Sequence, residues 1–305
     1  MDRQKFGYFR GILWFIMSLL CCVTNDSIMK HMGLKCHPLQ IVFMRFLFGV
    51  ITLLPFVLRD SLKSIKTSRP LAHIIRGLVL FSSITLWCSG LKSIPLNVVS
   101  LINFTTPMFT LIFAAIMLKE NIGWTRWIAT LCGFIGVGIV IGPGTSSFPV
   151  VGALILLLGA SMFALLDIIN KMLVSKESIL ASMFYTAIIT MALSAVPAII
   201  LWEPLSIYQF GLFFLLGMSS NFLLFCILKS FSLVDVSAVA PFRYFELIFA
   251  CLFGYVLFGE VVTAKTILGA AIIVPNAFYL MIREVSGDSN KVYNNKKKAS
   301  CCQAV

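Results

Sequence analysis

DSIMK at residues 26–30 and DIINK at residues 167–171 are the two stretches that decide the fold of this chain. Each closes a long apolar segment with an aspartate followed four residues later by a lysine, and the second copy starts 141 residues after the first. Glu120 and Glu260 each follow a later apolar run and repeat at nearly the same interval. The chain therefore contains two copies of one design. If each copy holds an odd number of membrane spans, the second copy is inverted relative to the first.

The composition is that of an integral membrane protein. Apolar residues make up 59% of the chain and charged residues 12%, with a mean hydropathy of +0.98, against roughly 45–50% and 25% in soluble domains. Long uncharged runs predict membrane-spanning helices, because a span needs about 20 apolar residues and the strands of a barrel would alternate apolar and polar side chains. We predict an all-α protein of ten transmembrane helices at residues 9–29, 38–58, 73–92, 96–118, 124–142, 150–170, 179–201, 207–228, 234–258 and 262–282.

These ten helices divide into two inverted repeats of five, at residues 1–142 and 150–282, and a basic tail follows at residues 283–305. The first helix has basic flanks, as a signal peptide does. No small-x-small cleavage site follows it, so we expect it to remain as the first span. The connections between the helices are too short to hold another domain.

The net charge of +12 is distributed unevenly between the two sides of the predicted membrane protein. Most of the 24 Lys and Arg residues lie in the terminal segments and the even-numbered connections, whereas the odd-numbered connections carry only Lys30, Lys35, Lys92 and Lys265. The positive-inside rule then predicts that both termini are cytoplasmic. We expect the basic tail to touch anionic lipid and not nucleic acid.

Nothing in the sequence indicates an enzyme. The nine cysteines have no Cys-x-x-Cys spacing, and no Gly-x-x-x-x-Gly-Lys-Ser/Thr loop or Ser/His/Asp set is present. We therefore expect no catalytic residues, no cofactor and no metal site.

Five ionisable residues deep within the predicted helices are candidates for a transport site. Each costs from about 2.5 to over 10 kcal/mol in the hydrocarbon, so it normally faces a cavity or a partner. Asp26 and Arg45 lie toward the outer ends of their helices, and Asp167 lies toward the inner end of its helix. Arg45 has no partner within its own helix, so we expect an aspartate across the bundle or a substrate carboxylate. Arg243 and Glu246 share one face of the ninth helix, where mutual neutralisation and substrate binding both remain open.

The surroundings of Arg243 and Glu246 favour substrate binding. The sequence APFRYFEL at residues 240–247 places a proline and aromatic rings beside the two charges. A proline frees a backbone carbonyl, and aromatic faces beside a carboxylate attract cations. Phe242 and Tyr244 are therefore candidate substrate-binding residues, suited to a cation that carries a ring.

The matching stretch of the first half has hydrogen-bonding groups in place of these charges. The interval between the repeats sets Asn103 opposite Arg243 and Thr106 opposite Glu246. We predict a substrate site at the membrane midplane. The two halves contribute similar backbone to this site but different side chains. Asn103 and Thr106 either bind substrate there or join two helices by a hydrogen bond.

Asp26 with Lys30, and Asp167 with Lys171, are i,i+4 pairs that each share one helix face. With the halves inverted, one pair lies near each membrane surface. Simple interfacial ion pairing and a role in gating both remain open, and we favour gating or coupling for the aspartates. Trp87, within the third predicted helix, either packs against its neighbours or stacks on a substrate ring.

The two five-span repeats, an acidic residue after the fourth and ninth spans and a proline in the fourth span resemble the drug/metabolite transporter superfamily, in particular its EamA-type members. Several stretches are similar to the S-adenosylmethionine uptake carriers of obligate intracellular bacteria. These stretches are Asn25-Asp26, residues 66–70 with His73 and 76–77, residues 166–171, and residues 234–247. The resemblance implies import of S-adenosylmethionine across the bacterial inner membrane, by exchange for S-adenosylhomocysteine.

This resemblance also implies roles for the candidate residues. Glu246 and the rings of Phe242 and Tyr244 would meet the positive groups or the adenine of S-adenosylmethionine, and Arg243 or Arg45 would meet its carboxylate. Exchange for S-adenosylhomocysteine moves positive charge inward, which a negative interior favours by about 2.3 kcal/mol per charge per 100 mV. The expected partners are these small molecules and the lipid bilayer, with a homodimer left open.

Two other functions remain alternatives to this uptake. The first is a proton-coupled EamA-type exporter of an amino acid, another metabolite or a drug, in which Asp26, Asp167 or Glu246 carries the proton. The second is a membrane scaffold, which the buried charges argue against because a scaffold has no use for them. The dependence of transport on pH distinguishes the exporter from the exchanger.

Overall fold

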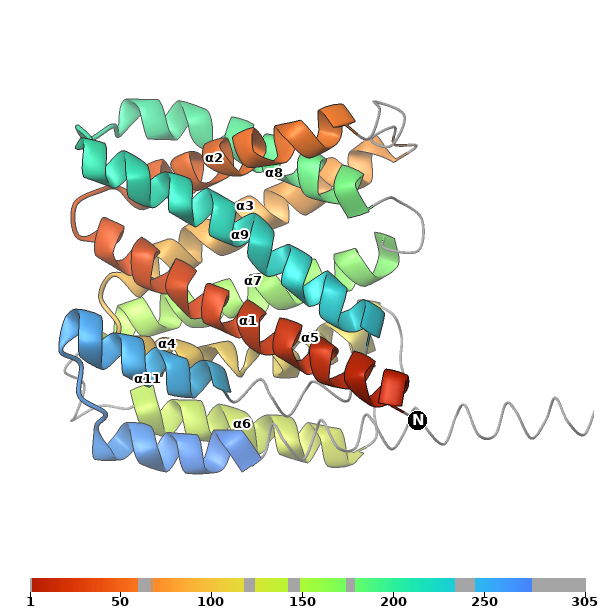
Figure 1. The fold of residues 1–305 in the computed structure, drawn as a ribbon. Helices are drawn as coiled ribbons and strands as arrows, with labels where there is room; N and C mark the ends of the chain where they lie inside the picture. The colour runs from red at the N-terminus through yellow and green to blue at the C-terminus, as the bar shows by residue number, and fades with distance from the viewer. Residues whose placement is uncertain are drawn as a thin grey trace, which may run out of the picture.

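The computed structural model describes residues 2–59, 67, 69–117, 124–141, 149–173, 179–233 and 245–275, and the regular elements within these ranges are all helices (Figure 1). They are α1 (Asp2–Gly33), α2 (Pro38–Arg59), α3 (Pro70–Leu91), α4 (Leu96–Asn103), α5 (Thr106–Met117), α6 (Trp124–Ile141), α7 (Val150–Leu173), α8 (Ile179–Ile200), α9 (Ile207–Leu233), α11 (Phe245–Phe258) and a last helix, Ala264–Pro275.

Seven helical stretches in the described residues are long and apolar enough to cross a membrane. They include α1 from Phe9 onward, α2, α3, the combined stretch Leu96–Met117, and most of α7, α8 and α9. The helix α11 and the last helix are shorter and also apolar. The prediction of a helical, multi-pass membrane protein is therefore confirmed for this part of the chain.

The predicted span at residues 96–118 is observed as Leu96–Met117, but a short turn divides it into two helices. The helix α4 ends at Asn103 and α5 begins at Thr106. The sequence explains the break, because a proline at position 107 has no backbone N–H and disfavours a continuous helix through the preceding residues. The Thr105 hydroxyl and backbone N–H both donate to the Ile102 carbonyl, at 2.6 and 2.9 Å, and close the turn.

The contacts between helices are equivalent in the two halves of the chain. Replacing each helix in a contact by its counterpart from the other half gives another contact that is also observed. The helix α1 packs mainly against α9, and α7, its counterpart in the second half, packs mainly against α3. Likewise α2 contacts α9 as α8 contacts α3, and α1 contacts α11 as α7 contacts α5. Most of the helix contacts thus join one half of the chain to the other (Figure 1).

The matching helices α1 and α7 run in opposite directions. The C-terminal part of α1 lies beside the C-terminal part of α3, where Trp87 contacts Asp26. The C-terminal part of α3 in turn lies beside the start of α7, because a Cβ added to Gly90 would be 2.8 Å from the Gly152 carbonyl oxygen. The end of the bundle that holds Gly33 therefore also holds the beginning of α7.

The largest cluster of buried apolar side chains lies at this same end. It takes residues from the C-terminal parts of α1 and α3, the beginning of α2, and α4 and α7, among them Met32, Leu91 and Val98. Close packing here brings the polar side chains described next into contact with one another.

Candidate functional site

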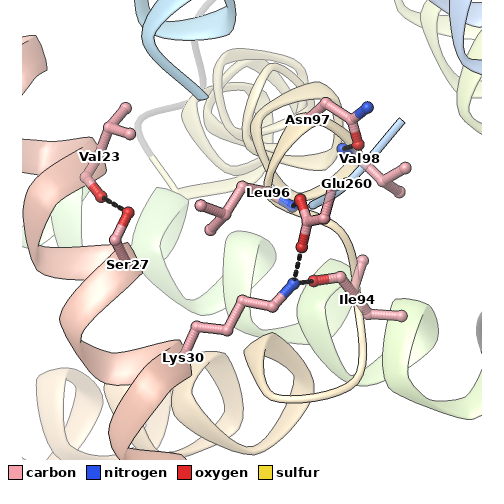
Figure 2. Close-up of polar contacts among 8 residues, drawn as sticks. All are labelled: Val23, Ser27, Lys30, Ile94, Leu96, Asn97, Val98 and Glu260. Carbon is pink, nitrogen blue, oxygen red and sulfur yellow. Dashed lines mark hydrogen bonds and ion pairs between the residues drawn. The ribbon is translucent and has the colours of Figure 1, made fainter. Parts of the chain in front are cut away.

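Lys30 ties three segments of the chain together at the end of the bundle where α1 finishes (Figure 2). Its Nζ forms an ion pair with Oε1 of Glu260 and donates to the Ile94 carbonyl oxygen. The second oxygen of Glu260 accepts from the backbone N–H of Leu96 at 2.7 Å. Because Leu96 begins α4, the carboxylate caps that helix where its backbone N–H groups have no helical partner.

The turn after α11 places Glu260 for this role. Gly259 has a φ of 64°, a left-handed conformation that glycine adopts without strain. The N–H of Glu260 then reaches back to the Gly254 carbonyl at 3.0 Å. A side chain at Gly254 would collide with the carboxylate, because an added Cβ would lie 2.5 Å from Oε2 of Glu260. The ring of Phe258 covers Lys30, with Nζ 5.1 Å from its centroid.

This arrangement corrects the pairing of Asp26 with Lys30 that their i,i+4 spacing suggested. Lys30 pairs with Glu260, which is 230 residues away in sequence. Asp26 instead accepts a hydrogen bond from Nε1 of Trp87 at 3.1 Å, and both side chains are buried. The Trp87 ring also meets Phe163 of α7 edge-on, with centroids 5.7 Å apart. Trp87 therefore packs between α1 and α7 and orients Asp26.

Arg45 of α2 faces Asp26 from across the bundle. Its Nη1 donates to the Met29 sulfur at 3.2 Å, and its guanidinium lies over the Phe46 ring. The charge of Asp26 acts on Arg45, yet none of the described carboxylates lies within ion-pairing distance of its guanidinium. The Nε of Arg45 is buried and has no hydrogen-bond partner in the described ranges. A buried cation in this state suits an anionic group of a ligand.

The broken span and α11 meet at Glu246. Nδ2 of Asn103 donates to Oε1 of Glu246 at 2.8 Å, and the Thr106 hydroxyl donates to Oδ1 of Asn103 at 3.2 Å. Glu246 is only 3% exposed. The predicted matching set Asn103 opposite Arg243, but Asn103 contacts Glu246. Arg243 lies outside the described residues, so the matching of Asn103 with Arg243 stays a prediction.

The structure thus brings together six of the predicted site residues, which come from α1, α2, α3, α4, α5 and α11. The charges of Arg45 and Glu246 both act on Asp26, while Trp87 and Asn103 hydrogen-bond to the two carboxylates. Two buried acidic groups and one half-buried basic group therefore lie in one region. This set complements a ligand that carries two positive groups and one negative group.

Other predicted residues lie elsewhere or outside the described part of the chain. Asp167 lies near the C-terminal end of α7 with an exposed side chain, at the opposite end of the bundle from Lys30. The side chain of Lys171 lies outside the described residues, as do Phe242, Arg243 and Tyr244 in full. The pairing of Arg243 with Glu246 stays a prediction.

The contacts of Glu260 were not predicted from the sequence. We identified it only as a marker of the repeat, together with Glu120. The signal that pointed to more was its position after Gly259, because a carboxylate at the end of an apolar run is costly unless it has a partner. Its partner lies in the other half of the chain, and helical periodicity cannot predict such a contact.

Comparisons with known proteins show which sequences and folds are similar to this chain. The model of the EamA-like transporter family matches residues 9–142 and 150–282. An S-adenosylmethionine uptake transporter of Rickettsia prowazekii is 42% identical over 285 residues, covering 93% of this chain and 96% of the relative. A riboflavin transporter of Vibrio cholerae is 26% identical over 277 residues, covering 89% and 92%. A solved crystal structure matches with a TM-score of 0.57 at 19% identity, covering 91% of this chain and 96% of that one, and it supports the fold alone.

Proposed function

This chain belongs to the EamA-like transporter family, and we infer that it imports S-adenosylmethionine across the bacterial inner membrane. Four Rickettsia relatives that are 41–42% identical over 93% of the chain are S-adenosylmethionine uptake transporters. The observation that carries the inference within the structure is the buried set of Asp26, Arg45 and Glu246. A membrane protein that binds no polar ligand has no reason to bury three charges in one region.

The charges of the buried set match those of S-adenosylmethionine. This molecule carries a sulfonium cation, an α-ammonium group and a carboxylate. Asp26 and Glu246 supply two negative groups, and Arg45 supplies one positive group. We propose that the two carboxylates bind the positive groups of the substrate and that Arg45 or Arg243 binds its carboxylate.

The adenine ring needs an apolar face and hydrogen-bonding groups. Phe242 and Tyr244 follow Pro241 immediately before α11, and we propose that their rings stack on the adenine. Asn103 and Thr106 lie at the break between α4 and α5, where helix ends leave backbone groups open to a ligand. Trp87 contributes indirectly, because its indole N–H holds the Asp26 carboxylate in place.

We propose that the fold consists of ten spans in two inverted repeats, residues 1–142 and 150–282. The exchange symmetry of the helix contacts and the opposite directions of α1 and α7 support this. Inverted repeats allow a rocking motion that opens a central site to either side in turn. By the positive-inside rule both termini, with the basic tail at residues 283–305, are cytoplasmic, which places Lys30 near the outer surface.

Under this topology the Lys30–Glu260 pair is an outer gate. It fastens α1 to the turn after α11 and to the start of α4, and the apolar cluster around Met32 and Leu91 lies at the same end. Opening the outer side requires that these contacts separate. We propose that Asp167 and Lys171 take part in closing the inner side.

We propose that import is an exchange for S-adenosylhomocysteine, which keeps the amino-acid group and the adenine but lacks the sulfonium charge. The same site then accepts both molecules. The negative interior drives the exchange, since about 2.3 kcal/mol is gained per charge per 100 mV.

Uptake of radiolabelled S-adenosylmethionine by cells that express the chain tests this function. Saturable uptake above that of control cells, stimulated by preloaded S-adenosylhomocysteine, is the expected result. Uptake that does not respond to preloading but follows an imposed pH gradient would indicate proton coupling and contradict the exchange. Absence of uptake, in cells whose membranes contain the protein, would contradict the proposed substrate.

A further inference from the structure

Asn25 of α1 is a buried amide whose polar atoms have no hydrogen-bond partner among the described residues. The residue is 2% exposed, and both Nδ2 and Oδ1 lack a partner. A buried polar group without a partner costs about 1–3 kcal/mol, and folded proteins rarely leave one unsatisfied. Both ends of this amide are therefore available to a ligand.

Arg45 lies close to Asn25. Asn25 and Met29 are four residues apart and share one face of α1, and the Met29 sulfur accepts from Nη1 of Arg45 at 3.2 Å. Arg45 is itself incompletely satisfied, because its buried Nε has no partner in the described part of the chain. An amide on α1 and a guanidinium on α2, both incompletely satisfied, are thus connected through Met29.

There is open space on the same side of α2. Gly49 is buried and lies one helical turn from Arg45, yet a Cβ added to Gly49 would meet no atom within 4 Å. An interior is normally close-packed, so open space beside a buried backbone is notable. It lies on the face of α2 that also carries Arg45, four residues earlier.

The repeat shows that the fold does not require this amide. The interval that matches Asp26 with Asp167 matches Asn25 with Leu166. Leu166 is a buried apolar residue, so an apolar side chain packs at the equivalent position of the second half. An amide in the first half, at a cost in stability, is therefore explained by ligand binding and not by the architecture.

We propose that Asn25 and Arg45 together bind the α-amino-acid end of the substrate. The Nδ2–H of Asn25 and the Nε–H of Arg45 donate to the carboxylate, and Oδ1 of Asn25 accepts from the α-ammonium group. This rests on the proposed function and deepens it, because it assigns selectivity for a free α-carboxylate to these two side chains. Glu246 and the aromatic residues then bind the sulfonium and the adenine.

Competition between two ligands tests the assignment. Unlabelled S-adenosylmethionine and its decarboxylated form, which differ only in the carboxylate, are compared for half-inhibition of radiolabelled S-adenosylmethionine uptake. Wild type should favour the carboxylated ligand roughly 10- to 100-fold, as expected for charge-assisted hydrogen bonds. Asn25→Leu, which installs the residue of the other repeat, should reduce this preference by roughly 3- to 10-fold, because one donor is lost while Arg45 remains.

A second amide, Asn221 on α9, serves as the matched control. Nδ2 of Asn221 on α9 donates to the Gly49 carbonyl at 2.8 Å and to the Thr52 hydroxyl at 2.7 Å, so its role is to join α9 to α2. Asn221→Ala should keep the wild-type preference even if the protein becomes less stable. Where a variant transports too slowly, the shift in melting temperature that each ligand gives to the purified protein supplies the same ratio.

The outcomes separate this inference from the proposed function. No uptake by wild type would contradict the function itself. Uptake by wild type without a preference for the carboxylated ligand would overturn the carboxylate site. A wild-type preference that persists in both Asn25→Leu and Asn25→Ala would show that ordered water satisfies the amide, and the assignment of Asn25 would be wrong.

Discussion

Asn103 and Glu246, which are 143 residues apart, share a 2.8 Å hydrogen bond between Nδ2 and Oε1. The bond joins the break in the fourth span of the first half to the start of α11 in the second half. The Glu246 carboxylate thus connects the C-terminal end of α4 to the N-terminal end of α11. We propose that substrate binding and conformational change both act on this pair of residues.

Glu246→Gln should abolish most uptake without unfolding the protein. The amide oxygen of the new side chain still accepts from Asn103, but the negative charge that binds the substrate cation is lost. We expect uptake at a subsaturating substrate concentration to fall at least about 10-fold, as loss of a buried charged partner commonly costs several kcal/mol. The measurement is initial uptake rate, normalised to the amount of protein in the membrane.

Glu203→Gln is the control for this change, since Glu203 is exposed in the connection before α9. It removes the same charge at a distance from the site and should leave the uptake rate within about twofold of wild type. Equal loss in both variants would show that the effect comes from overall charge and not from the site.

Glu260→Gln should weaken closure of the outer end. Lys30 would keep its contact with the Ile94 carbonyl but lose its buried ion pair, and a buried charge without its partner is destabilising. We expect slower uptake and faster reaction of Cys88 with an impermeant thiol reagent added outside, in a variant that retains only this cysteine. Cys88 is fully buried beside Arg45 and Asp26, so unchanged labelling would contradict a gate at Lys30–Glu260.

Gly217 and Gly49 should respond in opposite ways to alanine. A Cβ at Gly217 of α9 would lie 2.7 Å from both the Gly49 nitrogen and the Phe48 Cβ, whereas a Cβ at Gly49 would meet nothing within 4 Å. Gly217→Ala should force α9 away from α2 and lower stability by about 1–3 kcal/mol. Gly49→Ala should keep the wild-type melting temperature in detergent or raise it. Equal melting temperatures in the two variants would contradict the close approach of α2 and α9.

Cys36, between α1 and α2, should be a slow nucleophile. Burial, with a smaller contribution from the Glu203 carboxylate, raises the pKa of its thiol to about 11. Only the thiolate reacts, so labelling by an impermeant maleimide should keep rising about tenfold per pH unit from pH 7 to 9. Glu203→Gln removes a negative charge, lowers this pKa and should speed labelling at a given pH. A rate that levels off near pH 8.5 in wild type would contradict the raised pKa.

Most helix positions follow from the sequence because hydrocarbon thickness and the run of apolar residues define them. The predicted helix at 38–58 is observed as Pro38–Arg59, and that at 124–142 as Trp124–Ile141. The helix α1 is longer than predicted, because its polar N-terminal residues extend beyond the apolar run. The break at Phe104 and Thr105 was missed although Pro107 indicated it, since proline is often tolerated within membrane helices.

The candidate site was predictable where burying a side chain is most costly. Asp26, Arg45 and Glu246 were recognised because a charge within a span needs an explanation. Asn25 was not, because an amide costs less than a charge and its missing partners appear only once neighbouring helices are in place. The partner predicted for Lys30, Asp26, was wrong for a related reason. Helical spacing gives the residues that share a face, whereas packing between the two halves decides which of them touch.

Uptake of radiolabelled S-adenosylmethionine into proteoliposomes that contain the purified chain tests the central claim most directly, with and without S-adenosylhomocysteine inside and beside the Glu246→Gln variant. We predict saturable uptake that internal S-adenosylhomocysteine accelerates and that the variant loses. Uptake by wild type and by Glu246→Gln at the same rate would contradict the buried site. Absence of uptake in vesicles that contain correctly folded protein would contradict S-adenosylmethionine as the substrate.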